Sequence, residues 1–569
     1  MEKIKKLRNT FKRENIDGYL IPKNDEYFNE YLSNHNDRLS YITNFTGSYG
    51  FSLILKDKNY LFVDGRYSLQ ALNQSGKFFK IVTFPDTMPY EILKKKKLSI
   101  GFDPKLFTQK TLSIFFNKSK CLFKPVINNL VDEIWRRKIK KNKKKFYRLP
   151  SHSIGSGYKS KIFKIISLLR KKGADYQLIT SSENSAWLLN VRGRDIEYTP
   201  TPLSCILINK NRNINFFCEL KKIPLAFRTY FKEINFIDVS SLENVLSKIN
   251  NKNFILDNST CSYYYENIIS KNNRIIKDQD PIYHFKAIKN KKEIKNIKVA
   301  HIYDGVALTK YLFWVKRNFN KKKITEISGS NKLLRFRKQN KKFKFLSFPT
   351  ISGTGPNGAI IHYKAEKKSN RKLRKGDLYL VDSGGQYEFG TTDVTRTISL
   401  GNRSKKIKNI FTRVLKGHIA VSNYKIKKNS TGANIDKEAR KYLKQIGLNY
   451  SHGTGHGVGY FLNVHEGPQA ISKNNKVKFQ EGMVVSNEPG YYKKNNFGIR
   501  IENLIYVKKI KNNLQFKNLT MVPIEKDLIN FKLLTNLEKN YLSKYHLEVY
   551  SKISEYLNPD ERKWLTGFI

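Results

Sequence analysis

Four carboxylates and a group of histidines lie in one stretch of this 569-residue sequence. Asp382 ends an apolar run, and Asp393 follows in Thr391-Thr-Asp-Val-Thr. Glu488 closes the run Val484-Val-Ser-Asn, and Glu502 lies fourteen positions later in Ile499-Arg-Ile-Glu. Carboxylates with an imidazole suit divalent ions of the Mn, Co or Zn kind. Two such ions would share a water and lower its pKa, which predicts a hydrolytic site.

Four of the ten histidines fall in this same part of the chain, at His362, His452, His456 and His465. Two of them lie four apart in Ser451-His-Gly-Thr-Gly-His-Gly-Val-Gly, where glycines allow a close backbone approach. An aspartate at a strand end often caps a turn, and a single histidine is often structural. All of these residue types in this order are hard to obtain by chance, although the residues alone leave open which histidine binds a metal.

The carboxylates must be positioned by strands. We predict a hairpin that joins the strand ending at Asp382 to the strand through Asp393, with the glycines of 384–390 in its turn. A second hairpin would join Glu488 to Glu502 through a Pro489-Gly490 turn. Strand alternation then predicts Arg500 and Glu502 on one face, with Ile499 and Ile501 on the other. An arginine beside a carboxylate keeps it ionised.

The rest of the chain predicts additional domains. Apolar runs at 51–55 and 60–63 flank a polar turn, as in a hairpin, and a helical pattern at 162–169 precedes strand-like runs at 203–208 and 253–257. The basic run 136–145 is the best linker candidate. We expect two α/β domains of similar element order at 1–140 and 141–285, a catalytic domain at 286–510 that begins with a long helix (294–315), and a helical C-terminal extension at 511–569.

Composition narrows the class of protein. Lys and Arg exceed Asp and Glu by a formal charge of +60, but the lysines are spread along the whole chain, so we expect a charged surface and no specific nucleic-acid partner. Four cysteines without a C-x-x-C pair argue against a disulfide scaffold and predict reduced thiols. No apolar run approaches the ~18 residues of a membrane span, and no apolar segment follows the charged N-terminus, so we expect a soluble cytoplasmic protein without a membrane partner.

These residues resemble the aminopeptidase P (Xaa-Pro aminopeptidase) group of the pita-bread metallopeptidases, family M24. The resemblance carries the ligand order of the family onto Asp382, Asp393, His456, Glu488 and Glu502. Further segments match signatures of the two N-terminal domains and the C-terminal extension: Asn44-Phe-Thr-Gly-Ser, Val63-Asp-Gly-Arg-Tyr, Trp187-Leu-Leu-Asn-Val-Arg-Gly-Arg-Asp and Thr520-Met-Val-Pro-Ile. The resemblance implies a three-domain member with two creatinase-like α/β N-terminal domains in tandem and an α+β pita-bread catalytic domain.

The resemblance also implies roles. Asp393 and Glu502 should bridge two divalent ions, preferably Mn²⁺, with Co²⁺ or Zn²⁺ as alternatives. Asp382 should hold one ion, and His456 and Glu488 the other, with Glu488 also taking a proton from the bridging hydroxide. The catalytic-pocket histidines of the family match His362, His452 and His465, which should orient the substrate and stabilise the oxyanion. Arg500 matches a position beside the last ligand, and a homodimer is expected.

The expected reaction is hydrolysis of the N-terminal Xaa-Pro bond of peptides with proline at position 2. Prolidase, an Xaa-Pro dipeptidase, is the nearest alternative, but it is shorter, with one N-terminal domain. Creatinase is disfavoured because all five ligands are present. A non-catalytic binding protein of the same fold is a third alternative, and the +60 charge gives it some support.

Overall fold

The computed structural model describes residues 1–137 and 142–569. Part of the predicted linker at 136–145 therefore lies outside the described residues. The chain divides into two compact units, residues 1–283 and 284–569, which are described separately.

The first unit contains two six-stranded sheets, and the first has the order β4-β3-β2-β1-β5-β6. Strands β2 and β3 form the hairpin predicted from the apolar runs at 51–55 and 60–63. The strands are β1 (Gly18–Pro22), β2 (Phe51–Leu55), β3 (Asn59–Asp64), β4 (Lys80–Phe84), β5 (Ser99–Phe102) and β6 (Leu122–Pro125). The helices are α1 (Glu2–Thr10), α2 (Arg38–Thr43), α3 (Ser68–Ser75), α4 (Pro89–Leu93), α5 (Gln109–Phe116) and α6 (Leu130–Ile134). Apolar clusters on both faces bury this sheet.

The second sheet, β12-β11-β10-β8-β13-β14, repeats the topology of the first. In each sheet the first strand pairs antiparallel with the second and parallel with the fifth. Its strands are β8 (Tyr176–Ile179), β10 (Ser204–Asn209), β11 (Ile214–Cys218), β12 (Ile234–Asp238), β13 (Asn253–Leu256) and β14 (Arg274–Lys277). Its helices are α7 (Tyr158–Lys171), α8 (Ser182–Leu189), α9 (Leu225–Tyr230), α10 (Leu242–Ser247) and α11 (Tyr263–Ser270). The predicted similarity of element order is confirmed.

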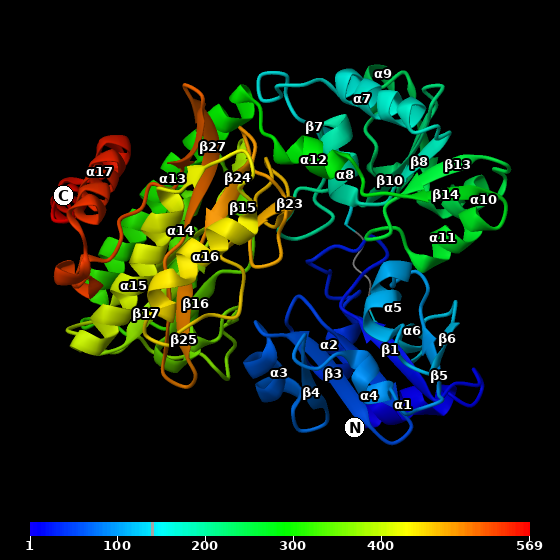
Figure 1. Cartoon of the computed structure of the whole chain (residues 1–569), viewed down its shortest axis with the longest axis horizontal. Helices are drawn as coiled ribbons and strands as arrows, with labels where there is room; N and C mark the ends of the chain where they lie inside the picture. The colour runs from blue at the N-terminus through cyan, green and yellow to red at the C-terminus, as the bar shows by residue number, and fades with distance from the viewer. Residues whose placement is uncertain (138–141) are drawn as a thin grey trace. The chain divides into compact units, whose positions relative to one another are not determined.

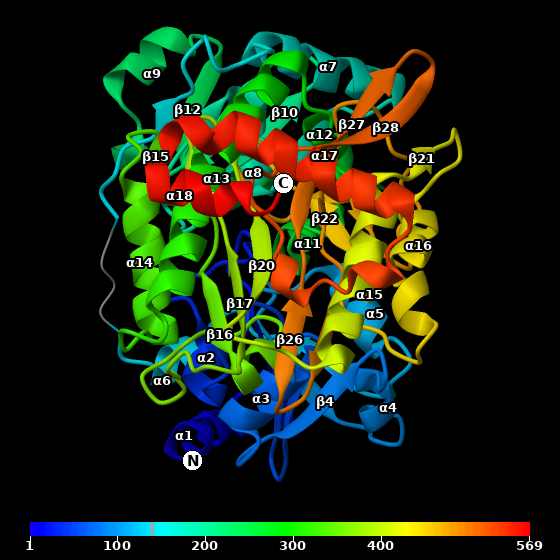
Figure 2. The same cartoon turned by 90° about the vertical axis from the view of Figure 1, so that its left-hand side faces the viewer.

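The second unit contains two helix pairs, each followed along the chain by strands. Its first half (residues 291–399) packs α13 (Lys291–Asn318) on α14 (Glu326–Lys338) and adds the antiparallel sheet β16-β17-β20. These strands are β16 (Ile351–Thr354), β17 (Leu378–Ser383) and β20 (Val394–Ser399), while β15 (Phe343–Leu346), β18 (Gly385–Tyr387) and β19 (Gly390–Thr391) form a smaller sheet. Figure 2 shows α14 next to β16 and β17.

Its second half (residues 405–518) packs α15 (Lys405–Ser422) on α16 (Gly432–Lys444). The six-stranded sheet β21-β28-β27-β24-β22-β23 follows. Its strands are β21 (Lys425–Ile426), β22 (Gly455–Gly457), β23 (Glu466–Ile471), β24 (Val484–Asn487), β27 (Asn503–Ile510) and β28 (Asn513–Asn518), and β25 (Gly490–Lys493) pairs with β26 (Phe497–Arg500). Helices α17 (Asn536–Ile553) and α18 (Pro559–Thr566) end the chain and contact α13 (Figures 1 and 2).

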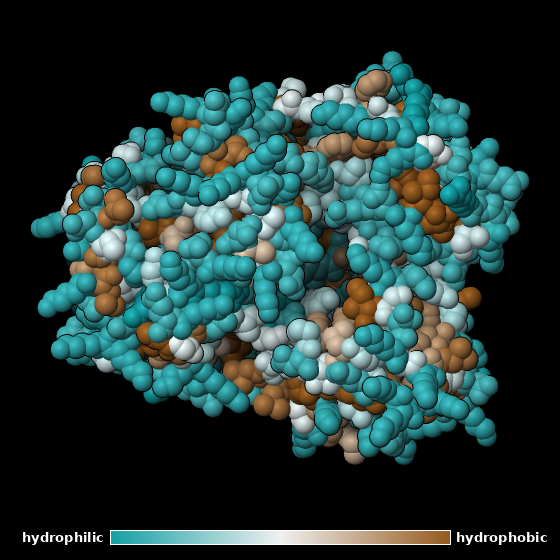
Figure 3. Space-filling model, in the orientation of Figure 1, coloured by the Kyte–Doolittle hydropathy of each residue, from teal (hydrophilic) through white to brown (hydrophobic). Residues whose placement is uncertain are grey.

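The C-terminal helices are joined to the strands by a buried arginine. The guanidinium of Arg396 in β20 donates to the Tyr545 hydroxyl of α17 over 2.9 Å and to the Glu502 carbonyl over 2.6 Å. Figure 3 shows hydrophilic residues over most of the visible face. None of the helices in the described ranges is long and apolar enough to cross a membrane.

Candidate metal centre

Three of the predicted ligands meet in one place. The metal-binding atoms of Asp393, His456 and Glu502 all lie within 4.8 Å of one another. Asp393 directly precedes β20, His456 is the middle residue of β22, and Glu502 lies between β26 and β27. Segments from both halves of the second unit therefore bring their polar side chains to a single point.

Asp382 reaches this site through two neighbours. It lies in β17 opposite Thr395 of β20, whose hydroxyl donates to the Glu502 carboxylate over 2.6 Å. The Arg500 guanidinium donates to Asp382 Oδ2 over 2.6 Å and to the Thr395 hydroxyl over 3.0 Å. Arg500 therefore bonds to Asp382 and to Thr395, and Thr395 bonds to Glu502, so these two neighbours link the carboxylates.

His456 is oriented by its backbone surroundings. Its Nδ1 lies 2.9 Å from the Gly457 carbonyl, so Nδ1 carries the proton and Nε2 is left to face the carboxylates. That Nε2 lies 3.4 Å from Asp393 and 3.6 Å from Glu488. The Ser486 hydroxyl accepts from the His456 backbone N–H and donates to Glu488, which links the backbone of His456 to the Glu488 carboxylate.

Burial and the closeness of like charges raise the pKa of several carboxylates in the cluster. Burial raises the pKa of Asp382 to about 7, although Arg500 opposes the shift. Burial, reinforced by Asp393 and its other carboxylate neighbours, raises the pKa of Glu502 well above its ordinary value, and burial also raises that of Glu488. Burial alone would lower the pKa of His456, but Asp393 and Glu488 more than reverse this and raise it to about 9. Divalent cations would replace these protons.

The three pocket histidines occupy different surroundings. The ring of His465 packs edge-to-face on His456, with centroids 4.4 Å apart. His362 follows Ile361, whose carbonyl lies 3.5 Å from the Arg500 guanidinium. His452 contacts the Tyr492 hydroxyl over 2.9 Å. The histidines thus come from separate loops around the carboxylates.

Tyr492 is a site residue that the sequence analysis missed. Its hydroxyl accepts from Arg500 over 2.7 Å and contacts His452, so it connects this histidine to Asp382 through the arginine. Its only signal in the sequence is an aromatic residue shortly after Pro489-Gly490, and that gives no indication of a partner.

The strand pairing of the first predicted hairpin is confirmed, since β17 and β20 pair antiparallel. Its expected turn at 384–390 is wrong, because β18 and β19 form a separate hairpin there and Asp382 lies opposite Thr395. The second predicted hairpin needs the same correction. Glu488, however, is not joined to Glu502 by a tight Pro489-Gly490 turn, because the separate hairpin β25–β26 lies between them and β24 pairs with β27. The alternation around Arg500 is confirmed, since Ile499 and Ile501 lie in a hydrophobic core cluster.

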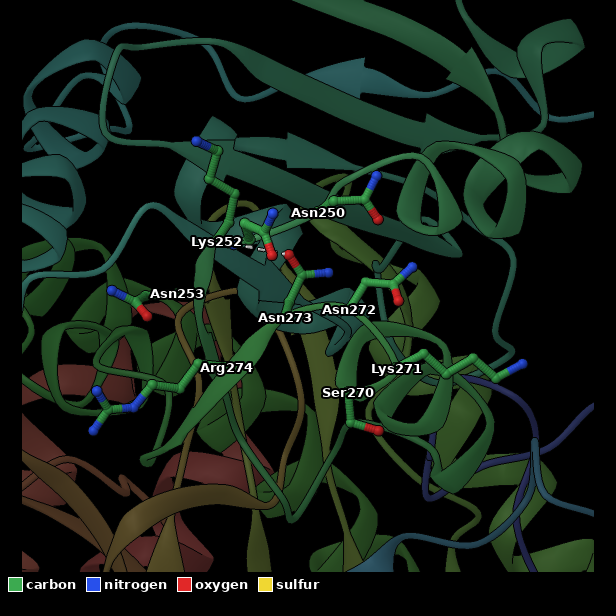
Figure 4. A pocket seen from close by; sticks show the side chains of 9 residues that line it. Asn250, Lys252, Asn253, Ser270, Lys271, Asn272, Asn273 and Arg274 are labelled. Atoms are coloured by element: carbon green, nitrogen blue, oxygen red, sulfur yellow. Dashed lines mark hydrogen bonds between the residues drawn. The ribbon is translucent and has the colours of Figure 1, made fainter.

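A surface pocket in the first unit contains none of the predicted site residues (Figure 4). It is lined by residues 250–253 and 270–274, whose labelled side chains point in different directions. Asn273 is used to hold its own loop, accepting from the Lys252 N–H and donating to the Ile249 carbonyl. This pocket shows no convergent chemistry.

Comparison with known proteins agrees with the geometry. Residues 295–509 match the profile of metallopeptidase family M24, residues 3–127 and 137–293 each match the creatinase/prolidase N-terminal domain, and residues 512–567 match the C-terminal region of peptidase M24. A Laccaria bicolor protein named "Probable Xaa-Pro aminopeptidase P" is 38% identical over 99% of this chain and 92% of its own length. The chain belongs to metallopeptidase family M24.

Other family M24 relatives match along the whole chain. "Xaa-Pro aminopeptidase 1" of Dictyostelium discoideum is 36% identical and covers 97% of this chain and 93% of that protein. The crystal structure of a Caenorhabditis elegans X-prolyl aminopeptidase, described as a cytosolic enzyme with a di-nuclear active site, superimposes with a TM-score of 0.94 at 31% identity, covering 100% and 98% of the two chains. A prolidase from Pyrococcus horikoshii is 26% identical with a TM-score of 0.51 and covers 64% of this chain and 99% of its own.

These M24 matches confirm the predicted fold class. The two repeated sheets of the first unit are creatinase-like α/β N-terminal domains in tandem, and the second unit contains the α+β peptidase domain.

Proposed function

We propose that this protein is a metal-dependent aminopeptidase that hydrolyses the N-terminal Xaa-Pro bond of peptides. The observation that carries the proposal is the convergence of Asp393, His456 and Glu502 in a chain whose full-length relatives are named Xaa-Pro aminopeptidases. The prolidase alternative is weaker, because the P. horikoshii prolidase leaves about a third of this chain unmatched.

The donor set fits a pair of divalent cations. Its carboxylates Asp382, Asp393 and Glu502 are buried, and Asp382 Oδ1 accepts no hydrogen bond from the described residues. A buried carboxylate oxygen without a donor is costly, and a cation relieves that cost. Asp393 and Glu502 are assigned to both ions, Asp382 to one, and His456 and Glu488 to the other. Oxygen-rich sets of this kind suit Mn²⁺, with Co²⁺ or Zn²⁺ as alternatives.

Bound ions would supply Lewis acidity and lower the pKa of a shared water. Glu488, whose side chain keeps 18% of its surface exposed, is placed to accept a proton from the attacking water. It passes that proton to the proline nitrogen as the C–N bond breaks. His362 and His465 orient the scissile carbonyl and stabilise the negative charge on its oxygen, while Arg500 binds Asp382 and opposes the rise of its pKa that burial causes. His452 supports this arrangement through Tyr492.

Proline at position 2 makes the scissile bond a tertiary amide without an N–H. Cleavage of longer peptides distinguishes an aminopeptidase from a dipeptidase.

We assign the domains as 1–140, 141–285, 286–510 and 511–569, and we expect a homodimer. We also expect the protein in the cytoplasm, since the C. elegans neighbour is described as cytosolic.

The test is release of arginine from Arg-Pro-Pro, compared with cleavage of an Xaa-Pro dipeptide, each with Mn²⁺ and with chelator. The proposal predicts metal-dependent cleavage of the tripeptide. Cleavage of the dipeptide alone would establish a prolidase. If the metal-loaded protein cleaves neither peptide but binds nucleic acid in a salt-sensitive way, the non-catalytic alternative is correct.

A further inference from the structure

The loop between β16 and β17 carries His362, and one buried carboxylate accepts hydrogen bonds from several points along this loop. Glu326 is the first residue of α14 and has no exposed surface. Its Oε1 accepts from the Thr354 N–H over 2.8 Å, where the loop begins. Its Oε2 accepts from the Tyr363 hydroxyl over 2.9 Å and from the Arg371 N–H over 2.8 Å, at the middle and end of the loop. The side-chain amide of Asn357 donates to both oxygens over 3.0 Å.

Glu326, which accepts these hydrogen bonds, is itself held in place at the start of α14. The Glu326 N–H donates to the Arg371 carbonyl and the Ile327 N–H to the Asn370 side chain, so the first turn of α14 is joined to the loop by its backbone as well. A carboxylate in the first turn of a helix also interacts favourably with the helix dipole. Charge-assisted hydrogen bonds of this kind are stronger than neutral ones and hold a definite geometry.

The middle contact lies directly beside the pocket histidine. Tyr363 follows His362 in the chain and is 5% exposed. Besides Glu326, its hydroxyl contacts Ser369 over 2.9 Å and accepts from Asn357 over 2.9 Å. On the other side of His362, the Ile361 carbonyl faces the Arg500 guanidinium that binds Asp382. His362 is therefore held between an anchor on α14 and the arginine of the candidate metal centre.

We propose that Glu326 and Tyr363 are positioning residues that fix His362 for the reaction. The proposal rests on the proposed function and extends it, because the effect on catalysis passes through His362 and through no contact of Glu326 or Tyr363 with the substrate. Small displacements of orienting groups lower rates about 10- to 100-fold.

The test is a double-mutant cycle. Tyr363→Phe removes one hydroxyl and should lower kcat on Arg-Pro-Pro about 10- to 100-fold, with little change in bound Mn²⁺. In the His362→Ala background the same substitution should change kcat less than about twofold, because the imidazole that Tyr363 positions is no longer present. An equal loss of kcat in both backgrounds, or no loss in either, would overturn the proposal.

Tyr311→Phe is the matched control. Tyr311 is fully buried in the same half, and among the described residues its hydroxyl bonds to that of Tyr379 over 2.7 Å and to no residue of the loop. It should lose similar stability and keep its activity.

A second measurement does not depend on peptidase activity. Hydrogen exchange of residues 355–371 should be faster in Tyr363→Phe than in the wild type or in Tyr311→Phe. Unchanged exchange in this loop would contradict the anchor even if the enzyme is active. If the loop exchanges faster in Tyr363→Phe but the wild-type protein cleaves no Xaa-Pro peptide, the anchor is supported and the proposed function is rejected.

Discussion

The two halves of the second unit follow one plan but support the site with different chemistry. The spacing from Thr325 to Lys372 to Asp382 equals that from Thr431 to Lys478 to Glu488, and each threonine caps a helix and forms a β-bridge with its lysine. Each half then supplies two carboxylates to the candidate metal centre. The repeated plan explains why ligands far apart in the sequence converge.

The support behind each ligand differs. In the first half, Arg337 forms a buried ion pair with Asp304 and donates to Ser383, the residue after Asp382. In the second half, a buried histidine takes this place: His418 Nδ1 contacts the carbonyl of Asn487, the residue before Glu488, over 3.0 Å. One ligand strand is therefore supported by a charge pair and the other by a neutral ring.

The loops that carry the pocket histidines also differ, but in the opposite sense. Tyr363, after His362, is anchored to Glu326 by a hydroxyl. Glu466, after His465, is anchored by buried lysines, with Lys289 in contact and Lys286 Nζ 3.6 Å away. The second anchor is ionic and fully buried, so its loss should cost more.

The largest expected effect comes from Glu502, the second-half carboxylate that is assigned to both ions. Glu502→Gln should lower kcat/KM on Arg-Pro-Pro about 10³-fold, because metal-ion stabilisation of the transition state is worth several kcal/mol. The measurement pairs steady-state kinetics with metal analysis of the purified variant. Activity within about tenfold of wild type would show that Glu502 does not hold the ions.

Loss of the Glu466 anchor should lower the free energy of unfolding more than loss of the Tyr363 anchor. Glu466→Gln leaves buried lysines without a charged partner and should lower the free energy of unfolding by about 3–5 kcal/mol. Tyr363→Phe removes one hydrogen-bonding hydroxyl and should cost about 1 kcal/mol. Urea unfolding of both variants checks this order, and equal losses would remove the distinction between an anchor made by an ion pair and one made by a hydroxyl.

The last prediction concerns acid. Burial, with Arg396 nearby, lowers the pKa of His418 to about 3, below the value of 6.5 expected for an unfolded histidine. The unfolded chain therefore binds the proton first, and this contribution to stability, complete above pH 6.5, is lost as the pH falls toward 3. Replacing His418 by Gln should reduce the slope of unfolding free energy between pH 6.5 and 4 by about 1.4 kcal/mol per pH unit. Identical slopes would show that His418 is not kept neutral in the folded protein.

The carboxylates and strand pairing could be predicted from the sequence, but several contacts could not. Asp382 and Asp393 stand at strand ends with clear apolar patterns, and the alternation around Arg500 follows from the period of a strand. The β25–β26 hairpin was missed because Pro489-Gly490 has the composition of a tight turn. The contacts of Tyr492 with His452 and of Glu326 with Tyr363 were missed because these partners are 40 and 37 residues apart, and local patterns carry no information about such pairs.

The central claim is that both halves hold one pair of divalent ions. The most direct measurement is a crystal structure of Mn²⁺-loaded protein with an anomalous difference map at the manganese edge. The account predicts two peaks about 3.5–4 Å apart, between Asp382, Asp393, His456, Glu488 and Glu502. A protein that is active on Arg-Pro-Pro but shows no peak among these residues, or only a peak elsewhere, would contradict it.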